Sequence, residues 1–248
     1  MVKGLDTFQE YFAGYEEHYV LIGGAACDIL FDRNEINFRA TKDLDMVLII
    51  EALTPEFGEK LWDFIVNAKY RNKATNGGKP QFYRFDKPED ELYPKMIELF
   101  CRSDFELKNA DGITPIHIDD EISSLSAILL DDEYYGVLLD GRAVISGIPV
   151  LRPEYIILFK AKAYLDLKMK KESGLLVDAD DIKKHKKDIL RIAAELKLEK
   201  ISGLPASVYD DIRKFIDTLE QDSFDQNLLK EYRLRNDEVI NLLKQVYF

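Results

Sequence analysis

The sequence changes character at Pro153. Before this residue, apolar runs typical of strands alternate with helical patterns, whereas only helical patterns follow it. A chain with this order is expected to fold as α/β (α+β), with a mixed sheet flanked by helices and then a helical C-terminal domain. We therefore predict two domains, residues 1–151 and residues 152–248. The length of 248 residues is sufficient for two modest hydrophobic cores.

The strand signals lie in the first of these domains. Residues 19–22 are a short apolar run that ends at Gly23-Gly24, and a helical pattern resumes at Ala25. The segments Tyr135–Leu139 and Arg142–Ile145, joined by Asp140-Gly141, predict a hairpin. Further strands are predicted at Leu44–Ile50, Gln81–Phe85 and Lys95–Phe100.

Charge and cysteine content limit the classes of protein. The 46 acidic residues outnumber the 34 basic ones, and a net charge of −12 argues against a protein that coats nucleic acid by bulk attraction. Cys27 and Cys101 have no metal-ligand spacing, which favours a reducing, cytoplasmic setting. With neither a secretory signal nor an apolar run of membrane-spanning length, the chain is expected to be cytoplasmic and to have no membrane partner.

The most informative motif is Asp43-Leu44-Asp45 at the entrance to a strand. Residues two apart on a strand project to the same face, so the two carboxylates lie together while Leu44 faces the other way. Two such charges repel unless a cation lies between them, and hard oxygen ligands suit Mg²⁺ or Mn²⁺ shared with substrate phosphates. The alternative is a solvated strand end without a ligand.

Gly23-Gly24 offers a phosphate site beside these acids. Without Cβ atoms the backbone can approach a polyphosphate closely, and the following helix directs N–H groups and its positive dipole end at the anion. An ordinary tight turn is the alternative. Arg39 and Thr41 precede the acids and could contact phosphate, or Thr41 could hydrogen-bond the local turn.

Glu98 is the candidate for a third carboxylate. It interrupts the apolar strand Lys95–Phe100, and burying an unpaired charge is costly, so a partner is expected. A second divalent cation would be one such partner, as two-metal phosphoryl transfer requires. Arg84 on the preceding strand would be the partner in a purely structural account.

The order of Gly23-Gly24, Arg39-x-Thr41-x-Asp43-x-Asp45 and Glu98 resembles the polymerase-β-like nucleotidyltransferase superfamily. Within it the chain is similar to AbiEii-type nucleotidyltransferases, the toxin halves of some bacterial toxin–antitoxin and phage-defence pairs. The helix that starts at Pro153 and contains Lys160 also resembles that family, as does Lys184-His185-x-x-Asp188. Many relatives have an acid where His185 stands, so Asp188 is the candidate for an acid–base role there.

The resemblance implies transfer of a nucleotidyl group from an NTP to an acceptor, with release of pyrophosphate. Asp43, Asp45 and Glu98 would bind Mg²⁺ or Mn²⁺, and Glu98 would help to activate the acceptor hydroxyl. Gly23 and Gly24 would hold the β- and γ-phosphates, and Lys160 would neutralise triphosphate charge. The implied acceptor is an RNA, such as tRNA, or a protein hydroxyl, and an antitoxin could be the protein partner.

Two other functions remain open at this point. The chain could be a nucleotide-binding interaction protein on a degenerate transferase fold, or a small-molecule transferase of the aminoglycoside type. The region 160–191 contains nine lysines and one arginine against six acidic residues. This stretch could guide an RNA acceptor, or it could be a solvated helix face.

Overall fold

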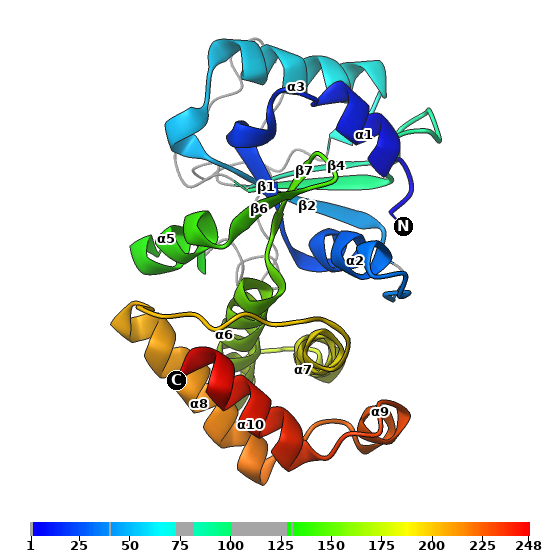
Figure 1. Ribbon diagram of the computed structural model, residues 1–248. Helices are drawn as coiled ribbons and strands as arrows, with labels where there is room; N and C mark the ends of the chain where they lie inside the picture. The colour runs from blue at the N-terminus through cyan, green and yellow to red at the C-terminus, as the bar shows by residue number, and fades with distance from the viewer. Residues whose placement is uncertain (1, 40, 73–81, 101–127, 130) are drawn as a thin grey trace. The chain divides into compact units, whose positions relative to one another are not determined.

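The computed structural model of the protein describes residues 2–39, 41–72, 82–100, 128–129 and 131–248 (Figure 1). The chain divides into two compact units. The first unit contains residues 1–129 and 142–151, and the second contains residues 130–141 and 152–248. Within the described ranges, no helix combines the length and the apolar character that crossing a membrane requires.

The first unit is built on a seven-stranded sheet in the order β3-β4-β5-β2-β1-β7-β6. The pairs β2–β5 and β1–β7 are parallel, and the other neighbouring pairs are antiparallel. The predicted mixed α/β sheet is therefore confirmed, and β2 is its central strand. The strands are β1 (Tyr19–Leu21), β2 (Asp43–Leu48), β3 (Arg71–Asn72), β4 (Phe82–Asp86), β5 (Met96–Phe100), β6 (Arg142–Ile145) and β7 (Ile148–Leu151).

Helices cover both faces of this sheet. Helices α1 (Leu5–Tyr11) and α3 (Pro55–Asn67) lie on one face, and α2 (Gly23–Arg33) lies on the other (Figure 1). Between α1, α3 and β1 the core is aromatic: the rings of Phe8 and Tyr19 meet edge to face with centroids 5.5 Å apart. Such pairs add specific geometry to the burial of large apolar surfaces, so they fix how these helices lie on the sheet. The described residues of this unit also form two short 3₁₀ turns, η1 (Glu16–His18) and η2 (Ile50–Ala52).

The predicted strand at Tyr135–Leu139 is wrong, because this segment is part of helix α5 (Asp132–Asp140) in the second unit. Asp131 caps the helix: its carboxylate accepts hydrogen bonds from the backbone N–H groups of Glu133 (2.9 Å) and Tyr134 (3.1 Å). The hairpin in this region is formed instead by β6 and β7. Its turn, Ser146-Gly147, has positive φ at both residues, as a tight two-residue hairpin requires.

The second unit is wholly helical in its described residues. Helix α6 (Pro153–Glu172) is buried along most of its first half and packs against α7 (Ala179–Glu195) and α8 (Ala206–Gln221). Because a helix buried on every side needs partners all round, α6 is the core helix of this unit. The predicted helical C-terminal half is confirmed. The remaining helices are α9 (Gln226–Glu231) and α10 (Asn236–Tyr247).

Candidate functional site

Asp43 and Asp45 lie at the start of the central strand β2. Both are half-buried, whereas Leu44 and Met46 between and after them are fully buried. This alternation puts the two carboxylates on one face of the sheet. The apolar side chains on the other face anchor the strand in the core, so the position of the acids is set by the packing of their neighbours.

The Gly23-Gly24 turn is packed directly against Asp45. The backbone N–H of Ile22 donates to the Asp45 carbonyl oxygen over 3.0 Å, which brings the end of β1 to the start of β2. Gly23 has a φ of +61°, and a Cβ at this position would lie only 2.0 Å from the Asp45 Oδ2 atom. The positive φ favours glycine here, and an added Cβ would also displace the Asp45 carboxylate.

Gly24 makes a similar close approach to Thr41. A Cβ on Gly24 would lie 2.6 Å from Thr41 Oγ1 and 3.2 Å from Thr41 Cβ. Thr41 thus lies close to the local turn, and its two predicted uses, phosphate contact and a hydrogen bond to the turn, stay predictions. Arg39 lies just before it, with the Arg39 Cζ atom 5.4 Å from the centroid of the Phe38 ring. Thr41, two residues before β2, therefore lies against the glycine turn.

Helix α2 starts at Gly23, two residues before the predicted start at Ala25. Its first turn contains no acidic residue, and its N-cap, Ile22, has no side chain that could cap it. The positive end of the helix dipole is therefore not offset by a carboxylate within its own first turn. This end lies beside Asp45, so a carboxylate that could hold a cation is next to backbone N–H groups that could hold an anion.

Glu98 is the register partner of Asp45 on the parallel strand β5. On its other side it is the register partner of Arg84 on β4. The Arg84 guanidinium donates to Glu98 Oε1 from Nε (2.9 Å) and from Nη2 (2.6 Å). The partner expected for the buried Glu98 charge is thus an arginine in this structure, which is the structural alternative that the sequence left open.

The donor set fits a divalent cation only in part. Asp43 and Asp45 supply hard oxygen ligands beside a glycine turn that a Cβ would obstruct. In the part of the chain that the structure describes, no group of three or more His, Cys, Asp or Glu side chains could hold a metal ion. Mg²⁺ is usually bound by one or two carboxylates together with substrate phosphates, so a pair of aspartates is a sufficient protein contribution.

Lys160 and Asp188 belong to the second unit, where they form a buried ion pair. Lys160 Nζ lies 2.8 Å from Asp188 Oδ2, and the exposed fractions of the two side chains are 9% and 0%. Arg191 approaches the other oxygen of Asp188 at 3.4 Å. The pair joins α6 to α7. The roles predicted for Lys160 in triphosphate binding and for Asp188 in acid–base chemistry stay predictions.

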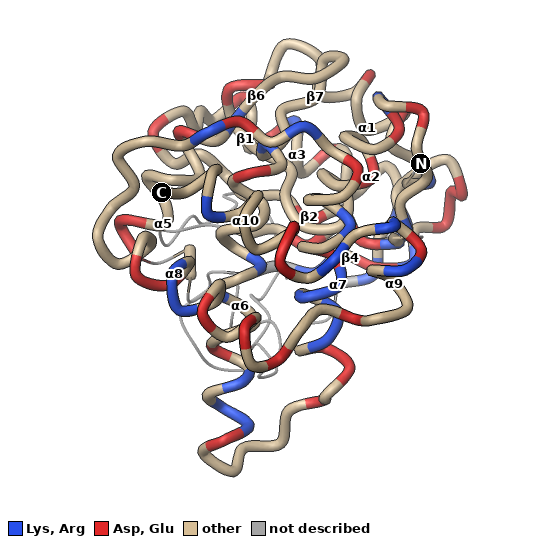
Figure 2. Tube along the Cα trace, turned by 60° about the horizontal axis from the view of Figure 1, so that its bottom comes forward, with Lys and Arg blue, Asp and Glu red and all other residues tan. Residues whose placement is uncertain are grey.

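Many lysines of the region 160–191 also pair within the second unit, and Figure 2 shows acidic residues alongside the basic ones of α6 and α7. Ion pairing of this kind weakens the interpretation of the region as a basic RNA groove, because the paired charges are already neutralised. Lys171 and Lys184 are exposed. The pairs are Lys160–Asp188, Lys162–Asp166 and Asp211, Lys183–Asp180, Lys186–Asp222 and Lys187–Asp225.

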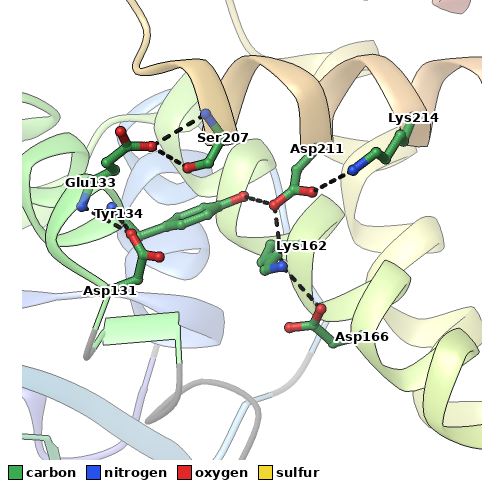
Figure 3. A network of polar contacts seen from close by, with 8 residues as sticks. All are labelled: Asp131, Glu133, Tyr134, Lys162, Asp166, Ser207, Asp211 and Lys214. Carbon is green, nitrogen blue, oxygen red and sulfur yellow. Dashed lines mark hydrogen bonds and ion pairs between the residues drawn. The ribbon is translucent and has the colours of Figure 1, made fainter.

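A polar network in the second unit was not singled out by the sequence (Figure 3). Lys162 Nζ lies 3.1 Å from Asp166 and 3.2 Å from Asp211, and the Tyr134 hydroxyl donates to Asp211 over 3.2 Å. The only local signal was the helical spacing of Lys162 and Asp166, because Tyr134 and Asp211 come from distant segments. The network joins α5, α6 and α8.

No family model matches the sequence, and no curated protein does. Among solved structures, the chain is similar to an antigenic nucleotidyltransferase-like protein from Paracoccidioides brasiliensis. The two are 15% identical with a TM-score of 0.46, and the match covers 100% of this chain and 96% of that one. At this level of similarity the two chains need not share a substrate or an activity.

Proposed function

We propose that the chain is a metal-dependent nucleotidyltransferase that moves a nucleoside monophosphate from an NTP to a hydroxyl acceptor. The observation that carries the proposal is the contact between the glycine turn and Asp45, where a Cβ on Gly23 would lie 2.0 Å from the carboxylate oxygen. It brings a backbone suited to phosphate and a carboxylate suited to a cation into one place. An NTP complexed with a divalent cation has both of these groups.

The residues would divide the work as follows. Gly23, Gly24 and the start of α2 would hold the β- and γ-phosphates, and Asp43 and Asp45 would hold Mg²⁺ or Mn²⁺ against the triphosphate. When bound, the cation would neutralise charge on the phosphates. The acceptor oxygen would form a bond to the α-phosphorus as the bond to the bridging oxygen breaks and pyrophosphate leaves. Glu98 would take the proton that the acceptor hydroxyl loses. Positioning and charge neutralisation account for most of such catalysis.

The acceptor that we favour is an RNA, such as tRNA, or a protein hydroxyl, with the chain acting as the toxin of a toxin–antitoxin pair. This part rests on the resemblance of the motifs to AbiEii-type enzymes. Expression of the chain should then halt growth, and Asp45→Asn should relieve the arrest. A neighbouring reading frame that restores growth would identify the antitoxin.

The direct test is incubation with α-³²P-labelled NTPs, Mg²⁺ and total cellular RNA or protein. We expect label in an acceptor with the wild-type chain and no label with Asp43→Asn or Asp45→Asn. Asp63→Asn is the matched control, because Asp63 is exposed on α3 and loses the same single charge. Label that is transferred only from the γ-phosphate would mean a kinase and would overturn the proposal.

The Arg84–Glu98 pair favours a second candidate, a nucleotide-binding protein without transferase activity. In such a protein Glu98 would serve only as the structural partner of Arg84. Calorimetry separates the two candidates: binding of Mg-NTP that persists in an Asp43→Asn and Asp45→Asn double variant, together with no label transfer by the wild-type chain, supports the non-catalytic protein.

A further inference from the structure

We infer that Arg84 is the internal counter-ion of Glu98, and that a divalent cation can bind this third carboxylate only by displacing the arginine. The inference rests on the proposed function, because it concerns control of the same site. It gives Arg84 a positioning role: in the cation-free protein it holds the carboxylate in place, and it competes with the cation for it.

Glu98 needs a positive partner because of where it lies. Its side chain is only 13% exposed. An ionised carboxylate in such a setting is costly unless it is paired and hydrogen-bonded. Asp45, its register partner on β2, adds a second negative charge on the same face of the sheet. The register of β2 against β5 thus places two carboxylates side by side, and a positive group is needed beside them.

Arg84 supplies this positive charge from β4, which lies on the side of β5 away from Asp45. Strand β4 pairs with β5 so that Arg84 and Glu98 are opposite one another, and both Nε and Nη2 donate to the same oxygen, Oε1. Charge-assisted bonds of 2.6–2.9 Å are among the stronger interactions of a carboxylate. While they persist, Glu98 is directed to β4 and Oε1 is occupied.

In the described residues no three acidic groups are placed to hold a metal ion, and Glu98 is paired with Arg84 instead. A divalent cation at Glu98 would have to approach the guanidinium, and two positive groups at such a distance repel. Cation binding and the Arg84–Glu98 bonds are therefore alternatives. The two aspartates would bind the first cation with the nucleotide, and Glu98 would join only when Arg84 withdraws.

If Arg84 and a cation compete for Glu98, one substitution of Arg84 should raise the affinity for the cation and lower the stability of the cation-free protein. Arg84→Gln removes the positive charge, so Mn²⁺ should bind on the order of tenfold more tightly, the size expected for one opposing charge screened by water at a few ångströms. The same variant leaves Glu98 without its counter-ion, so its melting temperature should fall in the absence of Mn²⁺. Saturating Mn²⁺ should restore most of that loss.

The experiment measures Mn²⁺ binding without nucleotide by electron paramagnetic resonance, together with thermal unfolding with and without Mn²⁺. Adding Glu98→Gln to Arg84→Gln should abolish the gain in affinity, because the carboxylate that binds the cation is then neutral. Arg142→Gln is the matched control. Arg142 lies on β6 at the opposite edge of the sheet and is also ion-paired, with Glu17, so this variant loses the same charge away from the site.

Each outcome decides the inference. Tighter Mn²⁺ binding by Arg84→Gln alone supports it, as does an Arg84→Gln chain that folds only when Mn²⁺ is added. Unchanged or weaker binding overturns it, and so does a chain that stays unfolded with saturating Mn²⁺. If the inference fails while Asp45→Asn still reduces Mn²⁺ binding, the proposed function is unaffected. If Asp45→Asn leaves Mn²⁺ binding unchanged, both fail.

Discussion

Asp45 on β2 and Glu98 on β5 are register partners in neighbouring parallel strands, although they lie far apart in the sequence. Backbone pairing rather than a flexible loop brings the two acids side by side. The two acids have different neighbours: Asp45 packs against the Gly23 turn, whereas Glu98 forms an ion pair with Arg84. The predictions that follow separate what these contacts contribute to binding from what they contribute to folding.

Gly23→Ala should weaken nucleotide binding as well as stability. A side chain at a φ of +61° costs about 1–2 kcal/mol, and the added Cβ must also displace the Asp45 carboxylate. Gly14→Ala is the control, because Gly14 has a φ of +88° but nothing lies within 4 Å of its Cβ position. Denaturant unfolding should show a larger loss for Gly23→Ala than for Gly14→Ala. Calorimetry with Mg-NTP should show weaker binding only for Gly23→Ala, and equal binding by both variants would contradict a phosphate site at this turn.

Lys160→Met should destabilise the second unit strongly, because it leaves Asp188 buried without its closest cation. Breaking a buried pair by removing one partner costs about 3–5 kcal/mol, whereas an exposed pair contributes little. Lys183→Met is the control, since Lys183 pairs with Asp180 on the exposed surface. In a double-mutant cycle measured by urea unfolding, Lys160→Met with Asp188→Asn should cost less than the sum of the single changes. Additive losses would show that the two side chains are not coupled.

Glu154→Gln should stabilise the chain increasingly as the pH rises. Burial raises the pKa of the Glu154 carboxyl above its ordinary value of 4.5, although Arg152 partly opposes this. A raised pKa in the folded state favours the protonated group, so the contribution of Glu154 is present below pH 4.5 and is lost as the pH rises through the folded pKa. The difference in unfolding free energy between Glu154→Gln and wild type should therefore grow as the pH rises above 4.5 and level off once the pH exceeds the folded pKa.

Glu199→Gln is the control for this pH dependence. Glu199 approaches the same arginine, Arg152, at 3.6 Å, but its side chain is 65% exposed, whereas that of Glu154 is 2% exposed. Its substitution should change stability little and by a similar amount across the range. A pH profile of Glu154→Gln that runs parallel to wild type would mean that burial does not shift the pKa of this group.

The features of the fold that could be predicted from the sequence are those that depend on a local pattern of side chains. The mixed sheet, the helical second half and the alternation around Asp43 and Asp45 all follow from side-chain periodicity, and the structure confirms the two fold features. The segment at Tyr135 was mistaken for a strand because its short apolar run fits either period. The hydrogen bonds that the Asp131 side chain accepts from the first helical turn favour the helix.

The parts of the site that depend on pairing between distant strands could not be resolved from the sequence. Nothing local distinguishes a metal from Arg84 as the partner of Glu98, because the choice depends on the register of β4 against β5. The same is true of Lys160, whose burial against Asp188 depends on the packing of α6 on α7. A lysine-rich segment has the same composition whether its charges are paired or free.

The network around Asp211 provides a last test, of how α5 is held to the rest of the second unit (Figure 3). Tyr134→Phe removes one hydrogen bond to Asp211 and should cost about 1 kcal/mol. Asp211→Asn should cost more, because it also removes a carboxylate from Lys162. Burial lowers the pKa of Lys162, but its hydrogen bonds and ion pairs with Asp166 and Asp211 outweigh this and raise the pKa above its ordinary value.

Hydrogen exchange locates the effect. If the network holds α5 in place, the backbone amides of α5 should exchange faster in Asp211→Asn than in wild type. Lys214→Gln is the control: Lys214 also approaches Asp211, at 3.6 Å, but its side chain is 64% exposed and its loss should leave the exchange of α5 unchanged. Faster exchange confined to α8, with α5 protected as before, would mean that apolar packing alone retains α5. Tyr134 and Val137, both buried, are the residues that would then be responsible.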